Sequence, residues 1–163
     1  MSLLGFDMNL LAVTTFDSAG TEEVARRLAR RLIPGDLVAL DGSLGAGKTV
    51  FVRGLAAGLG VDPELVRSPT FVLHHVYGSP PRLHHLDLFR LGARTGIALL
   101  DLDSLLDTAP VAVEWAGYAE LDAWGPLRLV FEIGDDLSRR IGASQPELAP
   151  ERLLEAWRDA VAR

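Results

Sequence analysis

The alternation of short apolar runs with amphipathic stretches predicts an α/β protein. Short apolar runs bounded by turn residues are typical of strands, whereas apolar residues spaced by three or four are typical of helices. We expect strands at 9–15, 37–40, 71–77, 83–89, 111–114 and 127–133. We expect helices at 21–32, at 48–58 and after Pro150, with ambiguous helical pieces at 95–107. This order favours a P-loop NTPase-like sheet that is mostly parallel, with one antiparallel hairpin and helices on both faces.

Two helix starts are predicted from single residues. The hydroxyl of Thr21 is expected to cap the first helix, because threonine satisfies the free N–H groups of a first helical turn. Pro150 suits the first turn of the last helix, where its missing N–H costs nothing. Apart from this helix, no element is predicted from Asp135 onward.

The length and composition are those of one globular domain. The chain has 163 residues, of which 48% are hydrophobic and 23% are charged, which is enough for a real core. There is no internal repeat or linker, so we expect a single domain over residues 1–163. Residues 1–8, which precede a second methionine, are expected to be an added or flexible start.

Charge and cysteine content exclude some classes of protein. The chain has no cysteine, so it has no disulfide framework and no thiolate metal site, which fits a reducing cytoplasm. No apolar run is long enough to span a bilayer, so we expect a cytoplasmic protein without a membrane partner. The formal net charge of −6 makes the chain a poor nucleic-acid binder on its own, because such binding neutralises phosphates.

A glycine-rich loop at residues 42–49, Gly-Ser-Leu-Gly-Ala-Gly-Lys-Thr, matches the phosphate-binding pattern G-x-x-x-x-G-K-[ST] at every required position. It follows a predicted strand and opens a predicted helix, as wrapping a phosphate chain with backbone N–H groups requires. The residues expected to supply this wrapping are Gly42, Gly45, Ala46 and Gly47. Lys48 would reach the β- and γ-phosphates, and the Thr49 hydroxyl would bind Mg²⁺. Of the 16 lysine and arginine residues, only Lys48 is a lysine.

Two acidic residues are candidates for the metal and for the attacking water. Asp87 lies inside an apolar run and Glu114 ends another, and ligands of α/β sheets bind beyond the carboxyl ends of strands. The structural alternatives are an edge acid paired with an arginine or histidine and a loop acid that caps a nearby element. Thr49, Asp87 and Glu114 are therefore the predicted metal ligands, although spacing does not decide which acid holds Mg²⁺ and which handles water.

Three further features have both a functional and a structural interpretation. Thr70, after Ser68 and Pro69, is either a sensor of the γ-phosphate or part of a plain turn. Trp115 either contacts the nucleotide or packs in the core. Four histidines fall in two pairs, at 74–75 and 84–85, and imidazoles bind transition metals. Neighbouring strand residues point to opposite faces, so ordinary polar strand positions are favoured over a metal site.

Four runs of residues resemble one known family. They are LDGSLGAGKT at 40–49, RSPTF at 67–71, HLDLFRL at 85–91 and VEW at 113–115. In this order and at this spacing they resemble the TsaE (YjeE) family, small bacterial P-loop ATPases of tRNA threonylcarbamoyladenosine biosynthesis. The resemblance extends over about residues 9–135, which is most of the chain.

The resemblance implies an activity, cofactors and partners. It implies a protein that binds ATP and Mg²⁺, hydrolyses ATP slowly by itself and is activated by partner proteins. It implies action with the TsaD and TsaB proteins, which carry the chemistry on the tRNA adenosine next to the anticodon. Contact with tRNA would then be indirect, through the complex.

The resemblance also implies roles for matching positions. Lys48 and Thr49 match the phosphate-loop pair, and Thr70 matches the switch threonine. Asp87 matches the acid linked to Mg²⁺, and Glu114 matches the acid needed for hydrolysis. Asp87, Glu114 and Lys48 are therefore the candidate catalytic residues.

Trp115 matches a tryptophan near the nucleotide. Two positions depart from the family pattern: Ser43 stands where aspartate is usual and Phe89 where tyrosine is usual. Neither departure removes a required charge.

Two other functions are compatible with a phosphate-binding loop. A small-molecule P-loop kinase would need an arginine-bearing lid, and the middle region offers only Arg82, Arg90 and Arg94 without a lid-sized insertion. A nucleotide-gated binding module would hold the nucleotide without useful hydrolysis. ATP itself is inferred from the resemblance, because the chain has no guanine-reading N-K-x-D motif.

Overall fold

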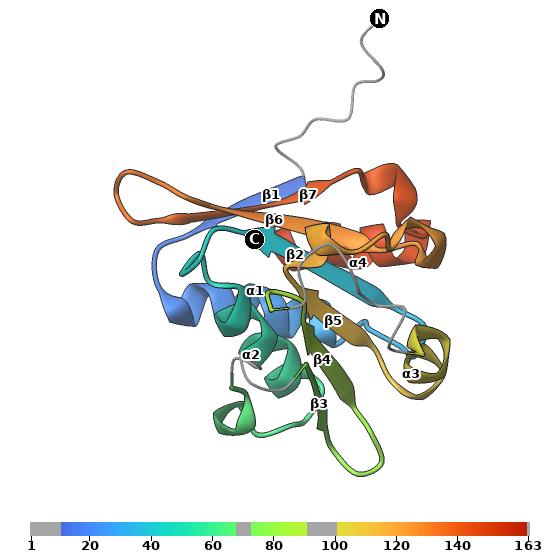
Figure 1. Ribbon diagram of the computed structural model, residues 1–163. Coiled ribbons are helices and arrows are strands. Elements are labelled where there is room, and N and C mark those ends of the chain that lie inside the picture. The colour runs from blue at the N-terminus through green and yellow to red at the C-terminus, as the bar shows by residue number, and fades with distance from the viewer. Residues whose placement is uncertain (1–10, 68–72, 91–100, 163) are drawn as a thin grey trace, which may run out of the picture.

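The computed structural model describes residues 11–67, 73–90 and 101–162, and the structural statements below refer to these ranges. Within them the chain forms one seven-stranded sheet with the order β1-β7-β6-β2-β5-β4-β3 (Figure 1). The strands are Ala12–Thr15 (β1), Leu37–Gly42 (β2), His74–Tyr77 (β3), Leu83–Asp87 (β4), Val111–Glu114 (β5), Leu127–Ile133 (β6) and Arg139–Ser144 (β7). The predicted start at residues 1–8 lies outside the described residues.

The centre of the sheet is parallel and both of its edges are antiparallel. β2 pairs in parallel with β5 and β6, and β4 pairs in parallel with β5. β3 pairs antiparallel with β4, as expected for the predicted hairpin. At the other edge β7 pairs antiparallel with both β6 and β1. The expectation of a single hairpin in a mostly parallel sheet therefore has to be corrected, because a second antiparallel edge is present.

The missed strand, β7, has a weak sequence signal. In its sequence RRIGAS only Ile141 and Ala143 are buried apolar residues. Only Ile141 is of a type enriched in strands, and glycine is depleted there, so the pattern of β7 does not stand out against the surrounding tail. Its pairing with β6 and β1 supplies the order that its own residues do not predict.

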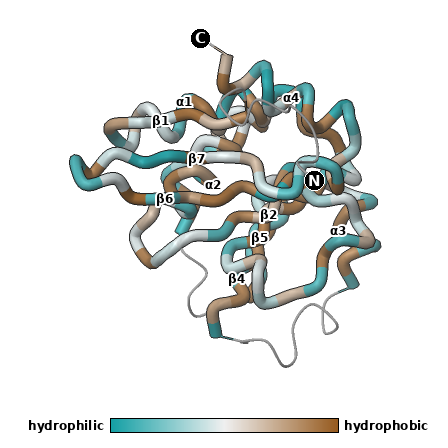
Figure 2. The backbone as a smooth tube through the Cα atoms, turned by 90° about the horizontal axis from the view of Figure 1, so that it is seen from above, coloured by the Kyte–Doolittle hydropathy of each residue, from teal (hydrophilic) through white to brown (hydrophobic). Residues whose placement is uncertain are grey.

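Helices cover both faces of the sheet, as predicted. The four α-helices are Ser18–Ala29 (α1), Lys48–Gly58 (α2), Leu102–Thr108 (α3) and Glu151–Val161 (α4). Residues of α1, α2 and α4 share one hydrophobic cluster with alternate residues of the strands, whereas α3 belongs to a second cluster on the opposite face. Figure 2 shows the contrast between hydrophobic stretches inside the molecule and the hydrophilic tip of the β6–β7 hairpin. None of the helices in the described ranges is long and apolar enough to cross a membrane.

The first helix begins earlier than predicted. Asp17 is its N-cap, and the Asp17 carboxylate accepts a hydrogen bond of 2.7 Å from the Gly20 N–H. Thr21 lies inside the helix, where its hydroxyl is buried and bonds Thr15 Oγ1 at 2.7 Å. The predicted cap at Thr21 is therefore wrong. The reason is that Asp17 offers a negative charge as well as an acceptor to the positive end of the helix.

An aromatic cluster anchors α2 beneath the sheet. The ring of Phe51 meets the ring of Phe131 edge to face, with centroids 5.5 Å apart. It also lies 6.3 Å from the ring of Trp157 in α4. Trp157 donates from Nε1 to the Leu11 carbonyl at 2.8 Å, so its polar atom is satisfied although the side chain is fully buried. The cluster fixes the height of α2, and therefore of the loop that precedes it.

The helices α1 and α2 pack closely against each other. A Cβ at Gly54 of α2 would lie 2.3 Å from the Glu22 carbonyl oxygen and 2.6 Å from the Ala25 Cβ of α1. Both are far below a normal van der Waals contact, and the nearest neighbour is backbone. Glycine at position 54 is therefore a condition for the α1–α2 contact.

We expect Gly54→Ala to lower the free energy of unfolding by about 1–3 kcal/mol or more, because the added methyl forces the helices apart. Urea denaturation followed by circular dichroism measures the change. The control is Gly142→Ala in β7, where a Cβ would meet its nearest neighbour at an ordinary 3.4 Å. Equal stability of the two variants would contradict the close-packing interpretation.

Candidate functional site

The glycine-rich loop lies where β2 ends and α2 begins. A Cβ at Gly42 would come within 2.7 Å of the Phe131 carbonyl oxygen, so only glycine fits at the exit from the strand. Gly47 is the N-cap of α2, with a φ of 105° in the left-handed region and no side-chain cap. The first N–H groups of α2 therefore keep their capacity to bind an anion from the loop side.

A cleft opens between this loop and the carboxyl ends of β4 and β5. Its lining joins loop, helix and strand residues that are far apart in the sequence: Leu44, Gly45, Ala46, Gly47, Lys48, Thr49, Val50, Asp87, Phe89, Glu114 and Trp115. Both predicted acids and the predicted tryptophan thus meet the predicted loop residues 45–49 in one place, whereas Gly42, at the end of β2, is not part of the lining.

Lys48 is a buried cation held inside the curve of the loop. Lys48 is only 5% exposed. Its Nζ donates to the carbonyls of Gly42 at 2.6 Å and Ser43 at 3.0 Å. The amine also lies 4.2 Å from the centre of the Trp115 ring, a cation–π distance. Burial lowers the pKa of Lys48, while the negative charge of Glu114 acts in the opposite direction. The site therefore concentrates one positive charge where the sequence predicts the phosphates.

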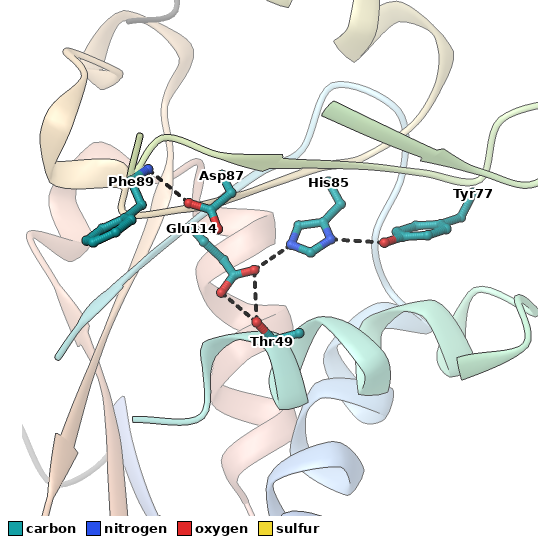
Figure 3. Close-up of polar contacts among 6 residues, drawn as sticks. All are labelled: Thr49, Tyr77, His85, Asp87, Phe89 and Glu114. Atoms are coloured by element: carbon teal, nitrogen blue, oxygen red, sulfur yellow. Dashed lines mark hydrogen bonds and ion pairs between the residues drawn. The ribbon is translucent and has the colours of Figure 1, made fainter. Parts of the chain in front are cut away.

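Glu114 links the loop helix to the sheet. The Thr49 hydroxyl donates to the Glu114 carboxylate at 2.9 Å from Oε1 and 3.2 Å from Oε2. On its other side, Glu114 Oε2 lies 2.6 Å from His85 Nε2 (Figure 3). Glu114 is 3% exposed, so these contacts provide the partners that a buried carboxylate requires.

Asp87 lies beside Glu114 at the end of the neighbouring strand. The two residues are directly opposite in the parallel pair β4–β5, so their side chains project from the same face of the sheet. The Asp87 carboxylate accepts from the Phe89 N–H at 2.9 Å. Burial raises the pKa of Asp87, with Phe89 acting in the opposite direction and the nearby Glu114 adding to the rise. The two acids thus form a pair of buried oxygen donors at one edge.

Trp115 follows Glu114 in a strained backbone conformation. Its φ of 57° and ψ of 41° are left-handed, which is rare for a bulky residue and typical of functional sites. The Trp115 ring packs on Phe89 with centroids 4.9 Å apart and still lines the cleft. Packing of Trp115 and a contact of Trp115 with a nucleotide are therefore compatible, since the ring packs on Phe89 and also borders the cleft.

Two residues that the sequence did not single out also shape the loop. Asp41 accepts from the Gly117 N–H at 2.8 Å, which ties the loop entrance to the turn after Trp115. Arg139, in the unpredicted strand β7, donates from Nη2 to the Gly45 carbonyl at 3.2 Å. Asp41 directly precedes the motif and could have been noticed, whereas nothing in the tail sequence indicates Arg139. Thr70, the predicted switch residue, lies outside the described residues.

The four histidines divide between the two faces of β3 and β4. His74 Nε2 lies 3.0 Å from His84 Nδ1, and His84 Nε2 lies 2.6 Å from the Thr108 hydroxyl. His85 points to the other face, towards Glu114. Across the described ranges no group of three or more His, Cys, Asp or Glu side chains is arranged to hold a metal ion. The polar-strand interpretation is therefore favoured over a histidine metal site, although His85 is buried behind the cleft and contacts Glu114, which lines it.

Fold and site together define an α/β protein with a charged cleft at the carboxyl ends of parallel strands, the usual ligand position in open α/β sheets. The family model described as "Threonylcarbamoyl adenosine biosynthesis protein TsaE" matches residues 15–141. The chain therefore belongs to the TsaE family.

Curated relatives support this assignment. A protein of Streptomyces coelicolor named tRNA threonylcarbamoyladenosine biosynthesis protein TsaE is 50% identical over 97 residues, which cover 57% of this chain and 65% of the relative. A protein of the same name from Aquifex aeolicus is 35% identical over 137 residues, covering 82% of this chain and 96% of the relative. The match thus spans slightly less than two thirds of the first relative and nearly all of the second.

A solved structure has the same overall arrangement. The crystal structure of Bacillus subtilis YdiB aligns with a TM-score of 0.66 and 29% sequence identity. The alignment covers 90% of this chain and 93% of that chain. The α/β fold is therefore shared over almost the whole length.

We expect Asp87→Asn to stabilise the ligand-free protein near pH 7.5. The folded state raises the pKa of Asp87 above its ordinary value of 3.8. As the pH rises from 3.8 through the folded-state pKa, ionisation of Asp87 therefore lowers the free energy of unfolding. The variant removes the cost, so its melting temperature should exceed that of the wild type at pH 7.5. The difference should shrink as the pH falls and disappear below 3.8, where Asp87 is protonated in both the folded and the unfolded state.

Scanning calorimetry at several pH values measures this difference. Asp107→Asn, which changes an exposed carboxylate of α3, is the matched control and should show no such pH-dependent gain. A variant at position 87 that is less stable than the wild type at pH 7.5 would contradict the assigned direction.

Proposed function

We propose that the protein is a P-loop ATPase that binds MgATP, hydrolyses it slowly and supports threonylcarbamoyl modification of the tRNA adenosine next to the anticodon. The observation that carries the proposal is the convergence of Lys48, Thr49 and Glu114 at the start of α2. The names of the relatives support the pathway. ATP as the nucleotide follows from the family resemblance.

The proposed grip on the phosphates is electrostatic. The N–H groups at the start of α2 point at the loop, and the helix dipole adds partial positive charge there. Lys48 Nζ would exchange its bonds to the Gly42 and Ser43 carbonyls for stronger ones to phosphate oxygens. Its burial strengthens this attraction, because the surrounding dielectric is lower than that of water.

The donor set fits Mg²⁺. This ion prefers oxygen ligands, usually one or two carboxylates completed by phosphates and water rather than an all-protein cage. Thr49, Asp87 and Glu114 offer a hydroxyl and two carboxylates along one side of the cleft. When bound, Mg²⁺ would neutralise charge on the β- and γ-phosphates. The direct contact of Thr49 with Glu114 makes Glu114 at least as suited to the ion as Asp87.

Hydrolysis needs a group that orients or deprotonates water. The Glu114 carboxylate accepts a hydrogen bond from the Thr49 hydroxyl, and its orientation is fixed from two sides. We assign the water-positioning task to Glu114 and metal binding to Thr49 with both acids, directly or through water. Lys48 would stabilise the charge that develops on the phosphates.

We propose TsaD and TsaB as the partners of this protein and the cytoplasm as its location. The net charge of −6 gives no electrostatic basis for direct tRNA binding, so tRNA would be reached through the complex. The small-molecule kinase alternative receives no support from the relatives, which are named for tRNA modification.

We expect Lys48→Ala to weaken MgATP binding by about ten-fold or more, because charge-assisted hydrogen bonds contribute about 1.5–3 kcal/mol each. Isothermal titration of the purified protein measures the affinity. Arg27→Ala removes an exposed cation of α1 and serves as the control, with unchanged affinity expected. Unchanged binding by the lysine variant would contradict the proposed phosphate site.

We expect Glu114→Ala to retain ATP binding measured in EDTA and to lose turnover, because the variant keeps Lys48 and the loop but lacks the carboxylate that handles water. Release of phosphate from labelled ATP is measured alone and with purified TsaD and TsaB. Normal hydrolysis by the variant would show that the assignment is wrong. Label transferred by the wild type to an added phosphoryl acceptor, rather than to free phosphate, would favour the kinase alternative.

A further inference from the structure

His85 is a buried polar residue with both ring nitrogens engaged. It is 0% exposed. Nε2 lies 2.6 Å from Glu114 Oε2, and Nδ1 lies 3.1 Å from the Tyr77 hydroxyl (Figure 3). The three side chains therefore form a continuous line of hydrogen bonds that ends on the carboxylate of the cleft.

The chemistry of the three groups gives the line one direction. An ionised carboxylate only accepts hydrogen bonds, so His85 Nε2 is the donor to Glu114. In a neutral imidazole the other nitrogen is then an acceptor, so the Tyr77 hydroxyl donates to Nδ1. The Tyr77 hydroxyl thereby stabilises the tautomer of His85 that donates to Glu114.

The sheet places these residues by register. His85 lies two positions before Asp87 on β4 and is opposite Ala112 of β5, just as Asp87 is opposite Glu114. Side chains two residues apart share a face, so His85 and both acids face α2. Tyr77 ends β3 opposite Leu83, on the same face. His85 thus lies one step deeper in the core than the acids, away from the cleft lining.

Glu114 has two donors with different tasks. The Thr49 hydroxyl donates to Glu114, but it is also a proposed magnesium ligand and would have to serve both groups. Both ring nitrogens of His85 are engaged, Nδ1 by Tyr77 and Nε2 by Glu114, and His85 is not proposed to bind the metal. It is therefore the partner that can keep the carboxylate oriented throughout a nucleotide cycle.

We propose that His85, aligned by Tyr77, is a positioning residue that holds the Glu114 carboxylate in the orientation needed for MgATP hydrolysis. The inference rests on the proposed ATPase function. In this proposal the site has two parts. Lys48 and the loop hold the phosphates, whereas the orientation of Glu114 affects turnover and the contribution of Mg²⁺ to binding.

Two amide substitutions of similar size test the proposal. In His85→Gln the amide nitrogen can reach the place of Nε2 and donate to Glu114. In His85→Asn the shorter amide can reach only the place of Nδ1, beside Tyr77. We expect His85→Asn to lower turnover at saturating MgATP by about 10–100-fold, the usual range when a group that orients a metal-binding side chain is removed. His85→Gln should restore most of that loss.

Binding and stability supply readouts besides activity. Titration of ATP in EDTA should give similar dissociation constants for wild type, His85→Gln and His85→Asn, because the phosphate grip is intact. With Mg²⁺ present, His85→Asn should lose most of the gain in affinity that the wild type shows. Tyr77→Phe should lower turnover less than His85→Asn, and it should add no further loss to His85→Gln, in which the link to Tyr77 is already broken.

The outcomes separate the inference from the function on which it rests. Equal turnover of the Gln and Asn variants, or turnover that follows their melting temperatures, would overturn the positioning role. ATP affinity in EDTA that falls as far as turnover would also overturn it. A wild-type protein that neither binds MgATP nor releases phosphate would instead refute the proposed function.

Discussion

Burial of a lysine beside two carboxylates is the constraint on which the site depends. A buried charge is tolerated only when it is paired and hydrogen-bonded, and the structure meets this requirement group by group. Lys48 bonds two carbonyls of its own loop, Glu114 takes donors from a helix and a strand, and Asp87 takes a backbone N–H. The opposite shifts in the pKa of Lys48 and of Asp87 both originate in burial. A ligand with phosphates and a divalent cation is the kind that such a set of charges suits.

The fold supplies this arrangement by bringing strand ends together. The parallel pairs β2–β5 and β4–β5 end at one edge, where the glycine-rich loop leaves β2 for α2. The aromatic cluster around Phe51 and the close α1–α2 contact at Gly54 fix the helix beneath that edge. The antiparallel edge contributes too, because Arg139 of β7 reaches the Gly45 carbonyl.

Much of the fold and of the site was predictable because the signals are local. The loop 42–49 and the helix at 48–58 follow from glycine, lysine and apolar spacing within a few residues, and β5 at Val111–Glu114 follows from a short apolar run. Asp17 displaced Thr21 as a cap because several suitable residues stand close together and spacing does not rank them. The strand β7 was not predicted because its order comes from pairing rather than composition. The link from His85 to Glu114 spans two strands, and no pattern within one strand reveals it.

The central claim is that Lys48 and the backbone of the loop grip nucleotide phosphates. The most direct measurement is a crystal structure of the full chain grown with Mg²⁺ and a non-hydrolysable ATP analogue. The account predicts phosphate oxygens within hydrogen-bonding distance of Lys48 Nζ and of the N–H groups at the start of α2, with the metal beside Thr49. A structure in which the analogue binds elsewhere while Lys48 keeps its bonds to the Gly42 and Ser43 carbonyls would contradict it.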